Sequence, residues 1–194
     1  MYLIKNSDKP TKCLPVISGA IRRPTDKNRA AFSLWQTGFR LAHISLETLR
    51  HEMVSKKIIA TPGLLSLIKQ EDLKPVIGLE QHSFTKITVS DLGLPDGSTL
   101  KMIYTKALAV GLNLCPSWVS YDLWIQNPGL LALDEACLVA MTPLIEPAGS
   151  LKVHQLWNDF GIKKIGIYHA NPDTKYGKNC AWIFVLPSTK KSLL

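Results

Sequence analysis

The sequence predicts an α+β protein, with N-terminal helices followed by an antiparallel sheet that carries one packed helix. Before residue 111, apolar residues recur three or four positions apart, which is the spacing of amphipathic helices. After Pro116, short apolar runs alternate with turn signals such as Asn127-Pro128-Gly129, which indicates an antiparallel meander. Helices first and strands afterwards favour helices packed on one face of a sheet.

Two short helices are expected in the N-terminal half. The first covers residues 45–56, where Ser45 suits the N-cap position. The second opens at Thr61-Pro62, with proline at the first helical position, and ends near residues 69–72. Residues 1–31 read as an irregular basic lead-in, with one short strand at residues 14–17.

The best-marked helix covers residues 98–110. Pro95-Asp96-Gly97 forms a turn before it, Ser98 or Asp96 can cap it, and Gly111 can end it in the left-handed conformation. Its expected buried stripe consists of Leu100, Ile103, Tyr104, Ala107 and Leu108. No ionisable catalytic group lies on this stripe, so we interpret the helix as a packing element.

The apolar runs after Pro116 are interpreted as members of the meander. They comprise residues 118–121, 123–125, 136–141, 151–157, 162–168 and 181–186. Turns are expected between them, including Asn158-Asp159-Phe160-Gly161.

Two motifs resemble a signature of small, uncharacterised bacterial proteins. The first is Asp91-Leu92-Gly93-Leu94, and the second, after the helix, is Gly111-Leu112-Asn113-Leu114-Cys115-Pro116. The resemblance covers roughly residues 84–187 and departs from the pattern at residues 125–133 and 154–178. No activity is established for that family, so the resemblance implies a domain boundary and no reaction. It divides the chain into residues 1–31, 32–83, 84–187 and a polar tail at 188–194.

The composition is that of an ordinary soluble globular protein, with 46% hydrophobic and 20% charged residues among 194. No run reaches the ~18–20 apolar residues of a membrane span. The N-terminus lacks the apolar region of a signal peptide, so a cytoplasmic location is expected. Secretion through a C-terminal signal stays open.

The positive charge belongs to the N-terminal third. Residues 1–60 hold eleven Lys and Arg against four Asp and Glu, whereas residues 61–194 hold twelve against eleven. The cluster Arg22, Arg23, Lys27 and Arg29 is a candidate nucleic-acid interface through counterion release. Because no aromatic residues are interleaved with it, a solvated face is the alternative.

Catalytic signatures are sparse. The sequence contains neither nucleotide-binding glycine motif and no G-x-S-x-G elbow, and we expect no cofactor. Cys115 with His154 or His169, oriented by Asp122 or Asp173, is the best candidate for a cysteine hydrolase or transferase. His43, Glu47 and His51 are spaced four residues apart and form a weak metal candidate, with an exposed polar face as the alternative.

Aromatic residues suggest a different role. Trp118, Tyr121 and Trp124 lie close together in the second half, and such residues serve either in cores or at interface hot spots. The leading hypothesis is therefore a non-enzymatic protein-binding module that uses these three residues. The alternatives are nucleic-acid association and cysteine-dependent chemistry, and the oligomeric state stays open.

Overall fold

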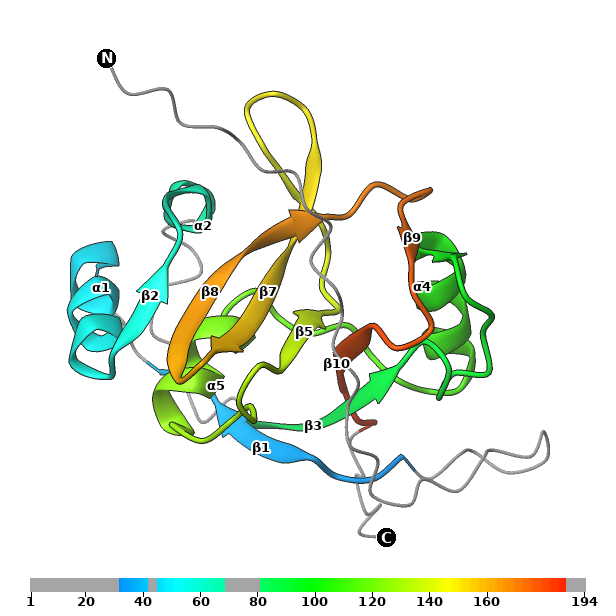
Figure 1. The fold of residues 1–194 in the computed structure, drawn as a ribbon, viewed down its shortest axis with the longest axis horizontal. Coiled ribbons are helices and arrows are strands. Elements are labelled where there is room, and N and C mark those ends of the chain that lie inside the picture. Colours follow the sequence, from blue (N-terminus) through cyan, green and yellow to red (C-terminus); the bar gives the residue numbers. More distant parts are fainter. Residues whose placement is uncertain (1–31, 42–44, 69–80, 188–194) are drawn as a thin grey trace, which may run out of the picture.

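The structure, a computed structural model, describes residues 32–41, 45–68 and 81–187, and contains four helices and ten strands there (Figure 1). The helices are α1 (Leu46–Ser55), α2 (Pro62–Leu67), α4 (Leu100–Ala109) and α5 (Val119–Gln126). The strands are β1 (Gln36–Phe39), β2 (Ile58–Ala60), β3 (Gln81–Thr88), β4 (Ser98–Thr99), β5 (Ala136–Val139), β6 (Leu144–Ile145), β7 (Leu151–Asp159), β8 (Ile162–His169), β9 (Lys175–Tyr176) and β10 (Ala181–Val185). The expected lead-in, its short strand and the polar tail lie outside the described residues.

Eight strands form one curled sheet in the order β1-β3-β10-β5-β7-β8-β2, and β6 adds to β7. The strands β4 and β9 make a separate pair. The sheet is mixed rather than antiparallel as expected, because β10 pairs parallel to β5 and β2 pairs parallel to β8. Since β1 and β2 precede residue 84, segments 32–83 and 84–187 share this sheet.

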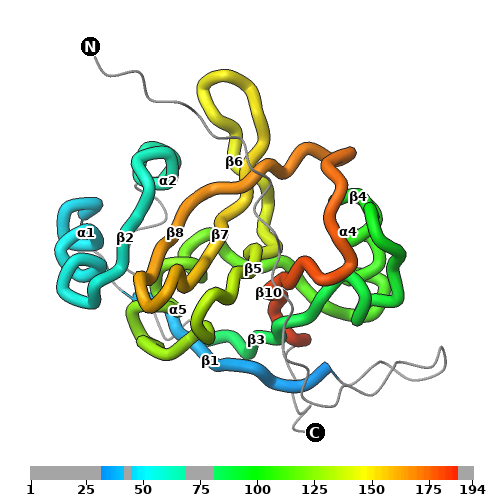
Figure 2. The backbone as a smooth tube through the Cα atoms, in the orientation of Figure 1, coloured from blue at the N-terminus to red at the C-terminus, as the bar shows by residue number. Residues whose placement is uncertain are grey.

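Helix α5 lies inside the curl of the sheet. It packs against both β1 and β7, although three strands separate these two in the sheet (Figures 1 and 2). The contact with β1 is close: a Cβ added to Gly38 would lie 2.8 Å from Leu123 Cδ1 and 3.2 Å from Phe84 Cε2. The curl therefore encloses a helix that forms the inner layer of the molecule.

Helix α4 covers the other face of the sheet. Tyr104 meets the rings of Trp182 and Phe184 edge-on, with centroids 5.9 and 6.4 Å apart. Tyr176 stands against the same tryptophan at 4.9 Å. Two helices thus pack on opposite faces, where the sequence predicted one.

The structure has a helix within each of the three segments expected from periodicity, although α2 ends at Leu67, before the expected end near residues 69–72. Ser45 and Thr61 accept hydrogen bonds from the first turns of α1 and α2. Helix α4 is capped by Thr99 instead of Ser98 or Asp96, and it ends in a Schellman motif at Gly111, whose φ is 90°. Within its stripe Leu100, Ile103 and Ala107 are buried as expected, Tyr104 is half-buried, and Leu108 is exposed.

Helix α5 replaces two expected members of the meander. Every residue from Val119 to Ile125 is buried, so the helix has no polar face and produces no amphipathic pattern. Two of its polar side chains instead find partners inside the fold. Asp122 accepts a hydrogen bond from Leu41 N at 2.8 Å, and Ser120 shares one with Nδ1 of His154 at 2.7 Å.

The same helix also satisfies the edge strand β1. Gln126 accepts from the backbone N–H of Phe39 at 3.1 Å and donates to its carbonyl at 2.5 Å, as a neighbouring strand would. Asn127 accepts a hydrogen bond from Gln36. Unpaired edge groups invite pairing with other chains, and α5 removes part of that opportunity.

Gly166 offers a direct test of the packing between β7 and β8. A Cβ there would lie 2.8 Å from Trp157 Cη2 and 3.0 Å from Thr61 Cγ2, and a rigid indole ring cannot yield. Gly166→Ala is therefore expected to lower the free energy of unfolding by about 1–3 kcal/mol, measured by denaturant titration. Gly129→Ala is the matched control, because nothing lies within 4 Å of its added Cβ and stability should change little. Equal effects at both positions would contradict this packing.

Candidate functional site

Apolar side chains gather on one corner of the sheet, on the face that carries α4 elsewhere. The register puts Trp157 opposite Lys164 and Lys164 opposite Ile59, so these side chains share that face with Ile162. Ile59 and Ile162 are 53% and 47% exposed, and Trp157 is half-buried. This corner is left open by the helices that the structure describes.

The turn between β7 and β8 adds the most exposed aromatic residue among those described. Asp159 pairs with Ile162, so Phe160 and Gly161 form a two-residue hairpin loop. Their φ values are 48° and 89°, the pattern of a type I′ turn, in which Asn-Gly or Asp-Gly is preferred. Phe160 is nevertheless 80% exposed and adopts a left-handed conformation that is rare for a bulky residue.

A neighbouring loop fixes the hairpin tip in place. Asp134 accepts a hydrogen bond from Phe160 N at 3.2 Å, and its own N–H donates to Asn158 O at 2.8 Å. The Asn158 side chain accepts from Gly161 N and donates to Leu131 O. Leu133, 69% exposed, lies beside the tip, with its Cδ2 3.9 Å from a Cβ added to Gly161. We call Ile59, Leu133, Phe160 and Ile162 the hairpin surface.

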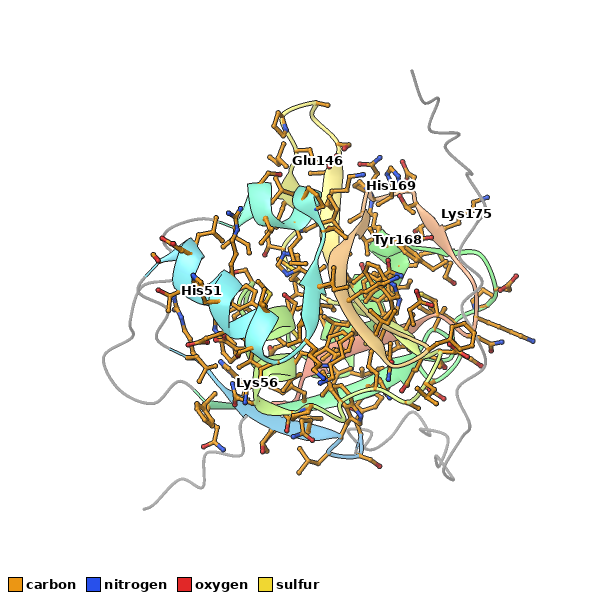
Figure 3. The ribbon with its side chains drawn as sticks, turned by 60° about the vertical axis from the view of Figure 1, so that its left-hand side comes forward. His51, Lys56, Glu146, Tyr168, His169 and Lys175 are labelled. Carbon is orange, nitrogen blue, oxygen red and sulfur yellow. The ribbon has the colours of Figure 1, made fainter. Side chains whose placement is uncertain are left out.

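Lysines flank the hairpin surface. Lys56 and Lys57 are exposed at the end of α1, and Lys163 and Lys164 open β8 (Figure 3 labels Lys56). Lys163 donates to the carbonyl of Lys56 at 3.3 Å, and Lys164 pairs with Asp159. Against these four lysines stand two carboxylates, Asp134 and Asp159, so the residues flanking the hairpin surface carry more positive than negative charge.

The structure places the predicted partner-binding residues in the core. Trp118, Tyr121 and Trp124 are no more than 2% exposed. Trp118 meets the ring of His82 at 5.8 Å, and all three belong to the segment enclosed by the sheet. The sequence left a tryptophan-rich core open as the alternative, and that is where the structure puts these side chains.

The candidate catalytic groups are engaged in separate interactions. The Cys115 thiol donates to the carbonyl of Ile183 at 3.3 Å, and burial raises the pKa of that thiol far above its ordinary value. His154 shares its Nδ1 hydrogen bond with Ser120. Asp122 accepts a hydrogen bond from the backbone N–H of Leu41, and Asp173 is exposed on a loop. A neutral, buried thiol is a poor nucleophile.

His169 belongs to a polar cluster at the base of the β6–β7 hairpin. Lys152 Nζ lies 3.2 Å from His169 Nδ1 and 3.4 Å from Glu146 Oε2. Figure 3 labels Glu146 and His169. A hydrogen bond from Ser150, and then the contacts with Lys152, hold the pKa of Glu146 below its usual value. The cluster ties the two ends of the hairpin together, and each charge in it already has an opposite or neutral partner.

The remaining candidates are dispersed. Glu47 and His51 approach within 3.9 Å on the exposed face of α1, while His43 lies outside the described residues. No metal-binding group of three ligands occurs within the described ranges. The basic cluster Arg22, Arg23, Lys27 and Arg29 also lies outside them. None of the helices in the described part of the chain is long and apolar enough to cross a membrane.

No protein-family model, curated protein or solved structure matches the chain. The hairpin surface was missed from the sequence, although a signal for it exists. Phe160 occupies a turn position where asparagine, aspartate or glycine is favoured. A bulky aromatic residue at such a position indicates a role other than forming the turn.

The state of Cys115 can be measured by alkylation. At about pH 8 its buried thiol is expected to stay protonated and to react with iodoacetamide only after unfolding. Cys137, whose pKa is raised by burial to about 12, is the internal control and should behave in the same way. Peptide mass spectrometry of native and denatured samples reports both sites. Fast and selective labelling of native Cys115 would restore it as a candidate nucleophile.

Proposed function

We propose that the protein is a non-enzymatic binding module that docks another protein on its hairpin surface. The partner has an apolar anchor that packs against Phe160 and Leu133, and acidic side chains that meet the flanking lysines. The observation that carries this proposal is the 80% exposure of Phe160 in a left-handed conformation. Backbone strain at a surface position is commonly kept for function.

Rigidity supports the proposal. Three hydrogen bonds join the tip to the loop at residues 131–134: Asn158 to Leu131 O, Phe160 N to Asp134, and Asp134 N to Asn158 O. The apolar side chains are therefore displayed on a fixed frame. Preorganisation lowers the ordering cost of association and raises affinity for a given area. Aromatic residues, phenylalanine included, are enriched at the cores of protein–protein interfaces.

The lysines favour an acidic protein over a nucleic acid. Surfaces that bind single strands combine a basic groove with several stacking rings. This corner has one exposed phenylalanine and one half-buried tryptophan beside three exposed aliphatic side chains. Aliphatic groups gain free energy by burial against a protein and find little partner surface on a phosphate backbone. Nucleic-acid association through residues 22–29 stays the alternative.

The variant Phe160→Asn tests whether Phe160 is kept for binding or for folding stability. Asparagine suits the left-handed conformation before Gly161, so the free energy of unfolding should rise by about 0.5–1 kcal/mol. Phe39→Asn is the control, because Phe39 is an exposed phenylalanine on the ordinary extended strand β1 and its replacement should lower stability. Thermal and denaturant unfolding measure both variants. Destabilisation by Phe160→Asn would show that the phenylalanine is retained for folding.

The partner is tested by photo-crosslinking in cells of the source organism. Benzoylphenylalanine replaces Phe160 in one sample and Leu108, an exposed apolar residue of α4, in the other. Position 160 is expected to give a discrete protein adduct that position 108 does not. The captured protein, once purified, should bind Phe160→Asn and Lys57→Glu at least about tenfold more weakly than the unaltered chain. A nuclease-sensitive adduct would favour the nucleic-acid alternative, and identical adducts from both positions would refute the docking surface.

A further inference from the structure

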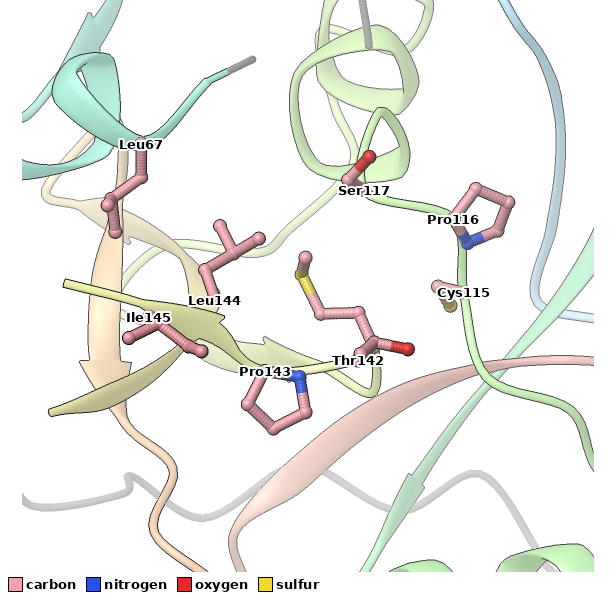
Figure 4. A pocket seen from close by; sticks show the side chains of 9 residues that line it. Leu67, Cys115, Pro116, Ser117, Thr142, Pro143, Leu144 and Ile145 are labelled. Carbon is pink, nitrogen blue, oxygen red and sulfur yellow. The ribbon is translucent and has the colours of Figure 1, made fainter. Parts of the chain in front are cut away.

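A pocket separate from the hairpin surface opens between α2, the segment after α4 and the segment before β6. Its volume is about 420 Å³, and Figure 4 shows Leu67 and Leu144 on one side and Cys115 and Pro116 on the other. Cavities of about 300–1,000 Å³ accept small organic ligands. The remaining lining residues are Ser117, Met141, Thr142, Pro143 and Ile145.

The pocket walls are fixed by hydrogen bonds. The Tyr104 hydroxyl donates to the carbonyl of Met141 at 2.9 Å and accepts from the N–H of the same residue at 3.1 Å. Cys115 N donates to Ala140 O at 2.6 Å, which joins the segment after α4 to the end of β5. Leu144 pairs with Lys152 of β7. These contacts preform the pocket, so a ligand would not need to order its walls.

The walls carry no ionised group. Seven of the nine lining residues are apolar or sulfur-bearing, and Ser117 and Thr142 supply hydroxyls. Burial keeps the Cys115 thiol protonated by raising its pKa. The nearest charged residues on the adjoining strand and turn, Lys152 and Glu146, pair with each other at 3.4 Å. A charged ligand would lose its hydration here without gaining a counter-charge.

We propose that this pocket binds an uncharged, largely apolar small molecule, oriented by a hydrogen bond to the hydroxyl of Thr142. This inference does not depend on the docking function, because the two sites share no residue. Apolar burial supplies the affinity, and one carbonyl or hydroxyl of the ligand would meet the polar side of the pocket.

The test uses two related fluorescent probes, neutral N-phenyl-1-naphthylamine and 1-anilinonaphthalene-8-sulfonate, which carries an added sulfonate. The neutral probe is expected to bind saturably and to shift the ¹³C-methyl resonance of Met141. Met53, buried on α1, and Met102, exposed on α4, are internal references that should not move. The sulfonated probe should leave Met141 unchanged.

Two tryptophan variants complete the test. Thr142 is exposed at the pocket, so Thr142→Trp can fill it without displacing a core residue, and binding of the neutral probe should weaken at least about tenfold. Thr105→Trp, at an exposed position of α4, should bind the probe as the unaltered chain does. The proposed site would be overturned if the neutral probe did not bind saturably, or if it bound Thr142→Trp as tightly as the unaltered chain. A resonance shift confined to Met102 would also overturn it. An equal Met141 shift with the sulfonated probe would overturn its neutral character.

Discussion

The burial of α5 is the constraint on which the rest of the structure depends. A helix with seven consecutive buried residues must be enclosed on all sides, and the curled sheet provides that enclosure. Its polar groups are the costly part, because an unsatisfied buried group loses the hydrogen bonds it made with water. Hydrogen bonds to His154, Leu41 and the backbone of Phe39 offset that loss. The same bonds join β1 at one edge to β7 in the other half of the sheet.

The enclosure of α5 removes the predicted binding and catalytic residues on and beside this helix from the solvent-exposed surface. Trp118, Tyr121 and Trp124 are the largest aromatic side chains of the inner layer, and their burial stabilises the fold. Cys115 lies just before the same helix, and its burial raises the pKa of its thiol far above the ordinary value. The two sites that we propose for recognition, the hairpin surface and the pocket beside Leu144, include no residue of this enclosed helix.

Sequence patterns within a few residues predicted the helices that have one solvent-exposed and one buried face. Helices α1, α2 and α4 were expected because the capping residues and the apolar spacing of each helix lie within about a dozen consecutive residues. Helix α5 was not, since a fully buried helix has no periodic contrast. The parallel pairing of β10 with β5 joins residues more than 40 positions apart, and no local pattern specifies it.

The candidate sites follow the same rule. The turn at residues 158–161 was expected, but its attachment to Asp134 and Leu133 depends on contacts between distant segments. The pocket is assembled from three segments around residues 67, 115 and 144. The one motif among them, at residues 111–116, implied a domain boundary and no ligand. Sequence reasoning therefore favoured the tryptophans as a binding site, although tryptophan indicates a buried core as readily as an interface.

Hydrogen exchange of the α5 amides tests the central claim most directly, because it asks whether the inner helix ever opens by itself. The account predicts that amides of residues 122–126, which are bonded within the helix, exchange only through global unfolding and match the most protected amides of β7 and β10. Exchange of α5 through a smaller, local opening would contradict the account. Trp118 and Trp124 would then be accessible to a partner in the folded protein, and the aromatic cluster would return as the binding site.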